Sequence, residues 1–321
     1  MAKKQKNTPS QSAPYRVITG EFHLFSKTAK GLHSGSQPDG DTIKFKPDRG
    51  KKAFAPIEKK PVPGGMDPGT KPKPRGVEFN DAGHCNLRFD AIDALELHFQ
   101  GAQQNDALAR QARELMLSTA GFASTEFAPK KFLEVRSATP HPINGYIISK
   151  GIDPYGRVVS FVFTGKPPKK DGSVLFLSTT QVRASINAGM LRAGHAQPAF
   201  YAGMPTDLRN TLAAESAKSR KPSKGLWVGF TPKTASPANS LKQLETSRIW
   251  PKLFRRLVNY FKDKPSGNLS GFDDWLRKRS DDDVIWLIPK MERGNLHDVY
   301  KVAGGSISMV FEPSELIIVP R

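Results

Sequence analysis

Residues 86–96 read NLRFDAIDALE, and this stretch decides how the chain is organised. Apolar and charged side chains alternate from residue 87 to residue 91, which is the pattern of a half-buried β-strand. The strand fixes Arg88 on a rigid element and leads into a segment that carries Asp93 and Glu96. A guanidinium beside two carboxylates suits a metal-assisted phosphate site, whereas the alternative is a solvated strand edge.

The composition favours a polyanionic partner. The chain has 321 residues, enough for two domains or for one domain with large additions, and its formal net charge is +19. Such a surplus of positive charge favours nucleic acid, and a membrane surface is the competing partner. We expect no membrane partner, because the chain has no apolar run of about 18 residues and no basic amphipathic helix.

The N-terminal residues and the cysteine content favour a cytoplasmic location. Residues 1–16 are rich in Lys, Gln and Ser and have no apolar core, so we expect no secretory signal peptide. The single cysteine, Cys85, excludes an intrachain disulfide. Both observations fit a reducing compartment and leave signal-independent export open.

Composition and periodicity divide the chain into segments. Residues 1–14 are expected to be a basic disordered tail, and residues 47–85 a long basic insertion that is either a solvated loop or a substrate contact. We place an α+β domain with a small barrel in residues 15–228 and a C-terminal α/β extension in residues 229–321. Strands are predicted at 15–25, 43–46, 86–96, 132–135, 146–149, 157–163, 174–177, 284–288, 299–302, 307–311 and 316–319. Helices are predicted at 103–119, 180–190, 206–218, 241–262 with a break at Pro251, and 272–279.

Several motifs follow one another at the predicted strand edges. DGDT occupies residues 39–42 before one strand, the arginine and the two carboxylates of residues 88–96 follow another, and YGR occupies residues 155–157 at the start of a third. The segment QVRASINAGM at 181–190 and a polar helix that ends near residue 227 complete the series. In this order the chain resembles the staphylococcal nuclease-like (thermonuclease) family over roughly residues 15–228. The resemblance implies a five-stranded Greek-key barrel of the oligonucleotide/oligosaccharide-binding (OB) type with packed helices.

The resemblance also implies a calcium-dependent nuclease that hydrolyses phosphodiester bonds in DNA or RNA without sequence preference. Asp41 and Asp93 would bind one calcium ion through their carboxylates, and Ala94 would bind it through its backbone carbonyl. Calcium takes six to eight oxygen ligands, so these groups and waters suffice.

The resemblance assigns the chemistry of cleavage to three further side chains. Glu96 would act as the general base or orient the attacking water. Arg88 and Arg157 would hold the scissile phosphate and stabilise the phosphorane, because a guanidinium offers a bidentate fork that a lysine does not. Tyr155 would contact a neighbouring phosphate, and Tyr201 would flank the substrate base.

Ala94 and Leu95 depart from the family pattern, in which Thr and Pro are usual, so we expect a less rigid loop at this position. Pro154 likewise stands where a basic residue is usual, which removes one phosphate contact. The family contains catalytically inactive members that bind nucleic acid or protein. A binding module of that kind is therefore the alternative to an active nuclease.

Two other segments contain residue types that can bind a metal ion. A zinc site at His84, Cys85 and His98 is disfavoured because the first two residues are adjacent, and a small buried cysteine at the start of a strand is the preferred interpretation. The acidic run at residues 280–283 lacks the glycine-centred loop of a calcium site, so a solvated turn is preferred there.

Overall fold

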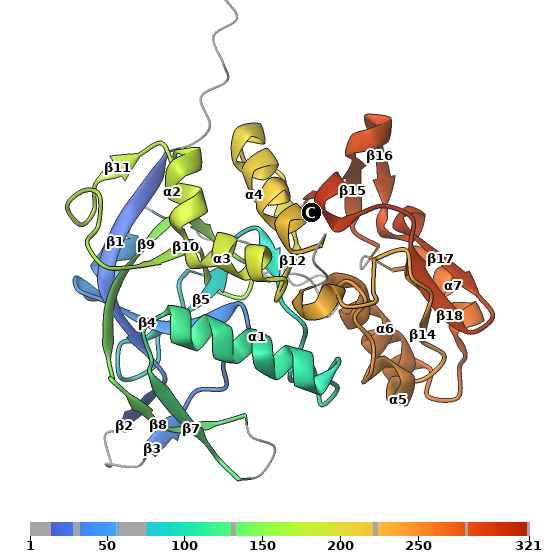
Figure 1. Cartoon of the computed structure of the whole chain (residues 1–321), viewed down its shortest axis with the longest axis horizontal. Coiled ribbons are helices and arrows are strands. Elements are labelled where there is room, and N and C mark those ends of the chain that lie inside the picture. Colours follow the sequence, from blue (N-terminus) through green and yellow to red (C-terminus); the bar gives the residue numbers. More distant parts are fainter. Residues whose placement is uncertain are drawn as a thin grey trace, which may run out of the picture.

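The computed structural model describes residues 14–27, 33–55, 57, 76–129, 133–220, 224–279 and 282–319. Figure 1 shows a β-barrel beside a second group of helices and strands, residues 229–319, which we call the C-terminal unit. The predicted N-terminal tail lies almost entirely outside the described residues. Residues 56 and 58–75 of the predicted insertion at 47–85 also lie outside them.

Five strands form a closed barrel with the order β1-β4-β5-β10-β9, and β9 pairs back onto β1. The strands are β1 (Tyr15–His23), β4 (Thr42–Pro47), β5 (Cys85–Phe89), β9 (Ile143–Ile152) and β10 (Val158–Thr164). All neighbours are antiparallel except β5 and β10, which run parallel. The short strand β11 (Val174–Leu175) extends the sheet beside β1. This mixed barrel with surrounding helices confirms the prediction of an α+β barrel fold.

Two glycines allow β1 to pass from one neighbour to the other. Gly20 of β1 pairs with Gly145 of β9, at the point where β1 also begins to pair with β4. A Cβ atom on Gly20 would lie 2.2 Å from the carbonyl oxygen of Lys46, and one on Gly145 would lie 2.2 Å from the ring of Phe22. Glycine is therefore needed at both positions for the barrel to close at this corner.

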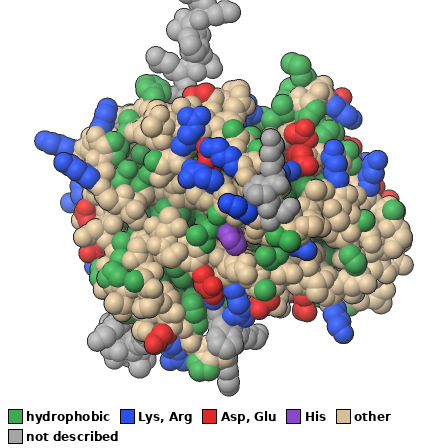
Figure 2. Space-filling view, viewed as in Figure 1, with side chains coloured by type: hydrophobic (Ala, Val, Ile, Leu, Met, Phe, Trp, Pro, Cys, Tyr) green, Lys and Arg blue, Asp and Glu red, His purple; other side chains and the backbone are tan. Residues whose placement is uncertain are grey.

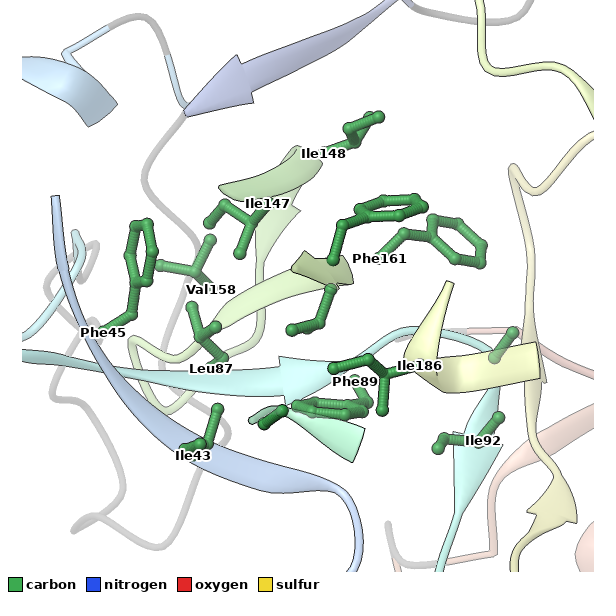
Figure 3. Packing of buried hydrophobic residues seen from close by; sticks show 14 of the residues in the cluster. Ile43, Phe45, Leu87, Phe89, Ile92, Ile147, Ile148, Val158, Phe161 and Ile186 are labelled. Atoms are coloured by element: carbon green, nitrogen blue, oxygen red, sulfur yellow. The ribbon is translucent and has the colours of Figure 1, made fainter. Parts of the chain in front are cut away.

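The barrel interior is filled by apolar side chains that alternate along the strands. Leu87 and Phe89 of β5 are buried, whereas Arg88 between them points to the other face. Figure 3 shows the two apolar side chains in a packed group with neighbours that include Ile43, Phe45, Val158 and Phe161. Because a slip of one residue would exchange the two faces of the strand, this packing determines the side on which Arg88 lies.

Four helices pack around the barrel, namely α1 (Asp106–Thr119), α2 (Thr179–Ala184), α3 (Ile186–Ala193) and α4 (Thr206–Arg220). One helix was predicted at 180–190, but the structure has two, because Ser185 caps a new helix by accepting a hydrogen bond from the backbone N–H of Ala188. Next to this cap, the buried side chain of Asn187 donates to the carbonyls of Asp90 and Ser160. This amide joins the ends of β5 and β10.

Three hairpins or short ladders lie outside the barrel. They pair β2 (Phe25–Lys27) with β3 (His33–Gly35), β6 (Ile92–Asp93) with β12 (Gln197–Pro198), and β7 (Ser124–Phe127) with β8 (Val135–Thr139). The strand predicted at 132–135 was therefore misplaced, because it starts at Val135 as the second arm of a hairpin. The strand predicted through 86–96 was too long, because the chain turns at Ala91, which has a positive φ of 67°.

The C-terminal unit has its own hydrophobic cluster. Its helices are α5 (Leu241–Leu244), α6 (Pro251–Asp263) and α7 (Phe272–Arg277). One sheet joins β13 (Phe200–Tyr201), β19 (Leu316–Val319), β15 (Val284–Leu287) and β16 (Glu292–Asn295), and a second joins β14 (Ser236–Pro237), β18 (Ser306–Met309) and β17 (Tyr300–Ala303). The predicted break at Pro251 is confirmed, because α6 starts there with proline at its first position.

Buried hydrogen bonds connect the C-terminal unit to the barrel. The side chain of Gln104 donates to the carbonyl of Ile249 at 2.9 Å, and that of Gln197 donates to the carbonyl of Arg248 at 2.9 Å. The indole of Trp250 donates to the carbonyl of Pro198 at 3.2 Å. Since buried polar groups are costly to leave unpaired, these bonds fix the two parts against each other.

The described residues do not support the solvated turn that was predicted at 280–283. Residues 280 and 281 are not described, but Asp282 is buried and accepts from the backbone of His297. Asp283 accepts from Lys252 and Arg256 of α6, each at 2.9 Å. Asp283 therefore helps to hold α6 in place, and Asp282 holds the segment at His297. In the part of the chain that is described, no helix is both long and apolar enough to cross a membrane.

Three histidines form a cluster at the end of the barrel that includes the start of β5. The rings of His23 and His84 stack with centroids 4.1 Å apart, and those of His23 and His141 meet edge to face at 5.2 Å. Burial, and then the neighbouring ring of His23, lowers the pKa of His84 and of His141 to about 4. The folded protein therefore holds these two rings neutral.

We predict that the free energy of unfolding falls as the pH drops from 6.5 to 4. In that interval the unfolded chain, with histidine pKa values near 6.5, binds protons that the folded chain does not bind. His84→Phe keeps a ring in the stack and should remove about 1–2 kcal/mol of this loss. Urea denaturation at several pH values measures the effect, and an equally steep loss in the variant would contradict it.

Candidate functional site

The turn that carries the DGDT motif lies beside the end of β5. Thr42 pairs with Arg88 in the register of β4 and β5, and the backbone N–H of Phe89 donates to the carbonyl of Asp41 at 2.9 Å. The backbone N–H of Ala94 donates to the carboxylate of Asp41 at 3.2 Å. Two segments that are about 50 residues apart in sequence thus meet through three residue pairs.

Arg88 lies between two carboxylates. Its Nη1 donates to Oδ2 of Asp41 at 3.1 Å, and its Nη2 donates to Oδ1 of Asp93 at 2.8 Å. The guanidinium side chain is 11% exposed, so these bonds are shielded from water. Burial works against the charged form, but Asp41, Asp93 and, more weakly, Tyr201 hold the pKa of Arg88 well above its ordinary value.

The turn at Ala91 brings Asp93 back toward Arg88. The left-handed backbone of Ala91 reverses the chain directly after β5, and its carbonyl accepts from the backbone N–H of Ala199. Asp93 then pairs with Gln197 in the short ladder of β6 and β12. The carboxylate of Asp93 is thereby positioned by backbone bonds and not by a flexible loop.

Glu96 is held through its backbone by Gln104. The backbone N–H of Glu96 donates to Oε1 of Gln104 at 3.2 Å, and its carbonyl accepts from the backbone N–H of Gln104 at 2.8 Å. Gln104 is fully buried and also donates to Ile249 of the C-terminal unit. The sequence did not indicate Gln104 as a functional residue, because a lone glutamine carries no motif.

A second guanidinium enters the site from the C-terminal unit. Arg255 of α6 donates through Nη1 to Oδ1 of Asp93 at 3.1 Å and through Nη2 to Oδ2 at 2.8 Å. Its Nη1 also donates to Oε1 of Glu96. Sequence reasoning missed Arg255. The apolar positions of α6 do place it on the polar face of a helix, but they do not say what that face contacts.

Asp39 is a fourth carboxylate of the site that was not singled out from the sequence. Its Oδ1 is buried and has no hydrogen-bond partner among the described residues. Burial, followed by the charges of Asp41 and Glu96, raises the pKa of Asp39 well above its ordinary value. An enclosed carboxylate oxygen of this kind is suited to bind a cation or to keep a proton.

The carboxylates respond differently to their surroundings. Burial opposes ionisation of Asp93, but Arg255 and Arg88 outweigh it and hold the pKa of Asp93 below its usual range. Burial, with Asp93 and Asp41 adding to it and Arg255 opposing it, raises the pKa of Glu96. Asp93 is thus held in its charged form, whereas Glu96 takes up a proton more readily than an ordinary glutamate.

The donor chemistry fits a hard divalent cation. All the side chains concerned offer oxygen, and four carboxylates face only two guanidiniums, so two negative charges are left over when all groups are ionised. As the side chains lie, no set of three or more His, Cys, Asp or Glu residues in the described part of the chain is arranged to hold a metal ion. The reason is that the two guanidiniums lie between the carboxylates.

Arg157 and Tyr155 form a second pair away from these carboxylates. Arg157 donates to Oδ2 of Asp153 at 2.6 Å, and its guanidinium lies 5.8 Å from the ring centroid of Tyr155. Val159 pairs with Arg88 in the register of β10 and β5, so Arg157, two residues earlier, lies on the same face of the sheet as Arg88. Tyr155 is 59% exposed.

The remaining predicted residues lie as follows. Tyr201 of β13 is close enough to Arg88 to influence its pKa, and Nζ of Lys252 lies 6.0 Å from its ring centroid. The sulfur of Cys85 is buried at the start of β5 and donates to the carbonyl of Phe45, as expected for a structural cysteine. His98 instead contacts the carbonyl of Gln37, so it does not share a site with Cys85.

No protein-family model matches the chain, and no curated protein sequence matches it. The function must therefore be inferred from the geometry of the site and from the motifs.

Gly40 makes the meeting of the two acidic segments possible. A Cβ atom on Gly40 would lie 2.6 Å from Cβ of Ala94 and 2.9 Å from Cβ of Ala112 in α1. We predict that Gly40→Ala lowers the free energy of unfolding by about 1–3 kcal/mol, because the DGDT turn must move away from both neighbours. Urea denaturation measures this change.

Gly151→Ala is the matched control, since a Cβ atom there has no atom within 4 Å. It should change the stability by less than about 1 kcal/mol. Equal stability of the two variants would show that the turn is free to shift.

Proposed function

We propose that the protein is a calcium-dependent nuclease of the staphylococcal nuclease-like type, which hydrolyses phosphodiester bonds in DNA or RNA. The observation that carries this proposal is the buried guanidinium of Arg88, which bonds to Asp41 and Asp93 at the end of a barrel strand. Glu96, whose pKa is raised by burial, belongs to the same cluster. Charged groups of both signs on rigid elements are what phosphoryl-transfer chemistry requires.

The strand order supports an OB-type Greek-key barrel. The first three barrel strands, β1, β4 and β5, are consecutive antiparallel neighbours, the fifth lies parallel to the third, and the fourth closes onto the first. OB barrels commonly bind oligonucleotides on one face and its adjoining loops. The face of β5 that carries Arg88 corresponds to such a binding face in this proposal.

Each residue has a definite task in the proposed reaction. Asp41 and Asp93, with the backbone carbonyl of Ala94, would hold a calcium ion, which when bound neutralises phosphate charge and makes a water more acidic. Glu96 would accept the proton of the attacking water as the water oxygen bonds to phosphorus. The P–O bond to the leaving oxygen then breaks, and that oxygen takes a proton from solvent water. Arg88, whose Nη atoms bond to Asp41 and Asp93, would exchange at least one of these bonds for a phosphate oxygen and stabilise the charge that develops there.

Arg157 joins the site only after it leaves Asp153. Its present bond to Asp153 holds the guanidinium within 5.8 Å of the exposed ring of Tyr155. With a phosphate at this edge, Arg157 would exchange its bond to Asp153 for a bond to a phosphate oxygen. Tyr155 would then contact the next phosphate along the nucleic-acid strand. Tyr201, near Arg88, would then lie against the substrate base.

The alternative function is a nucleic-acid-binding or protein-binding module without catalysis. One observation favours it, namely that Arg255 bonds to Asp93 and Glu96 at the same time. If this guanidinium stays in place, neither carboxylate is fully available for a metal or a water. A cleavage assay separates the two functions.

We predict that the purified protein cleaves single-stranded or double-stranded DNA or RNA with calcium, and that a chelator abolishes cleavage. Arg88→Ala and Glu96→Gln should each lower the rate by about 10²–10³-fold, on the scale of one lost charge-stabilising donor. Gel electrophoresis of labelled substrates measures the products. Arg277→Ala is the control, because Arg277 bonds to Asp273 in the C-terminal unit. This variant should cleave at the normal rate.

Activity that survives both the chelator and Arg88→Ala would overturn the mechanism. A protein that is inert with every divalent ion but binds DNA would instead favour the binding module.

The surface charge supports a nucleic-acid partner. Figure 2 shows Lys and Arg side chains gathered in the upper middle of the face that is viewed, where Figure 1 places α2 and α4. Arg183, Arg192 and Lys218 belong to these helices and to α3, and all three pair with the buried carboxylate of Glu215. Three cations against one anion leave this surface positive.

We predict that binding of the Glu96→Gln variant to an oligonucleotide weakens by about tenfold or more between 50 and 200 mM salt, because bound phosphates release counterions. Fluorescence anisotropy with two oligonucleotides of different sequence measures the affinity. Arg183→Ala should weaken binding to both sequences alike and reduce the salt slope by about 1. A salt-independent affinity would argue against a phosphate-binding surface.

A further inference from the structure

One polar face of α6 lies along the segment that carries the acidic residues. Arg255 bonds to Asp93 and Glu96, four residues later Asn259 accepts from the side chain of Gln100 at 3.1 Å, and three residues after that Lys262 donates to the carbonyl of Gln100 at 2.5 Å. Residues spaced by three and four lie on the same side of a helix. The contact of Arg255 is therefore part of a continuous helix–segment interface.

The helix that carries Arg255 is fixed. Its opposite side is buried in the C-terminal cluster, and Lys252 and Arg256 bond to Asp283 next to it. Trp250 at its start is buried and donates to the carbonyl of Pro198 in the barrel part. The position of α6 therefore places the side chain of Arg255 in the site. This side chain is 18% exposed.

Arg255 uses the oxygens that a metal ion would need. Both oxygens of Asp93 accept from its guanidinium, Oδ1 also accepts from Arg88, and Glu96 uses one oxygen for Arg255. A carboxylate oxygen that already accepts two N–H donors has no lone pair left for a third partner. A guanidinium and a divalent cation at one carboxylate also repel each other.

We propose that Arg255 competes with calcium for Asp93 and with the attacking water for Glu96, so that the C-terminal unit sets the metal affinity of the site. This inference rests on the proposed function, because it concerns the same carboxylates. At low calcium the guanidinium of Arg255 bonds to the carboxylates of Asp93 and Glu96. At high calcium the side chain of Arg255 swings away while α6 stays docked, which requires only rotamer changes of one arginine.

Calcium titration of the full chain without substrate tests the proposal. Isothermal titration calorimetry compares the wild type with Arg255→Gln, which removes the charge and the fork. We expect the variant to bind calcium at least about tenfold more tightly, a change of about 1.4 kcal/mol. Arg255→Lys, which keeps the charge but loses the fork, should give a smaller gain and serves as a second variant if Arg255→Gln does not fold.

Arg256→Gln is the matched control, because Arg256 is the next residue of α6 and bonds to Asp283 instead of the site. It should leave the calcium affinity within about twofold of the wild type. An equal gain in this control would show a general charge effect and would overturn the competition.

An affinity of Arg255→Gln that equals or falls below that of the wild type would also overturn it, since Arg255 would then only position the carboxylates. Absence of calcium binding in both proteins would do the same. The proposed function fails separately: tighter calcium binding in Arg255→Gln without cleavage of any nucleic acid would uphold the competition and reject the nuclease.

Discussion

The arrangement of the site depends on one buried ion pair network, the guanidinium of Arg88 between Asp41 and Asp93. It connects the turn before β4 to the turn after β5, so both chain segments must be in register for the bonds to form. The alternating pattern of β5 puts Leu87 and Phe89 into the barrel and thereby turns Arg88 toward the carboxylates. Burying these charges is favourable only as a set, because removal of one partner leaves the others unpaired in a shielded place.

The same network explains how the segment 93–96, which contains no proline, still holds its carboxylates in place. Ala94 and Leu95 do not stiffen the chain, but Ala94 is bonded to Asp41, and Glu96 is bonded through both its N–H and its carbonyl to Gln104. Gln104 in turn bonds to the C-terminal unit. Rigidity that a proline would supply locally is here supplied by tertiary hydrogen bonds, and the C-terminal unit is part of that support.

Much of the barrel could be predicted from the sequence, because period-2 patterns such as that of residues 87–91 reflect burial on one face of a strand. The nearness of Asp41, Arg88 and Asp93 was implied by the resemblance of their motifs, and the hydrogen bonds of Arg88 do bring these three side chains together. Arg255 and Gln104 could not be expected. Their importance comes from the docking of α6 onto the segment after β6, and a helix sequence records which face is polar but not which surface that face meets. The turn at Ala91 was missed for a related reason. Alanine rarely adopts a positive φ, and here only the tertiary contacts around Ala91 impose it.

The charge balance makes the state of Arg255 decisive for the chemistry. With Arg255 in place, the four carboxylates of the site face two guanidiniums, and burial disfavours the surplus negative charge and raises the pKa of Asp39 and of Glu96. Unit charges about 4 Å apart near a protein surface interact by about 4 kcal/mol, and a divalent ion would feel about twice that repulsion from a neighbouring guanidinium. At equal distance this repulsion equals the attraction of the divalent ion to one carboxylate and is about twice the attraction of the guanidinium to that carboxylate. In the proposed competition, the C-terminal unit, by placing Arg255, therefore favours the guanidinium-bound form of the site over the calcium-bound form.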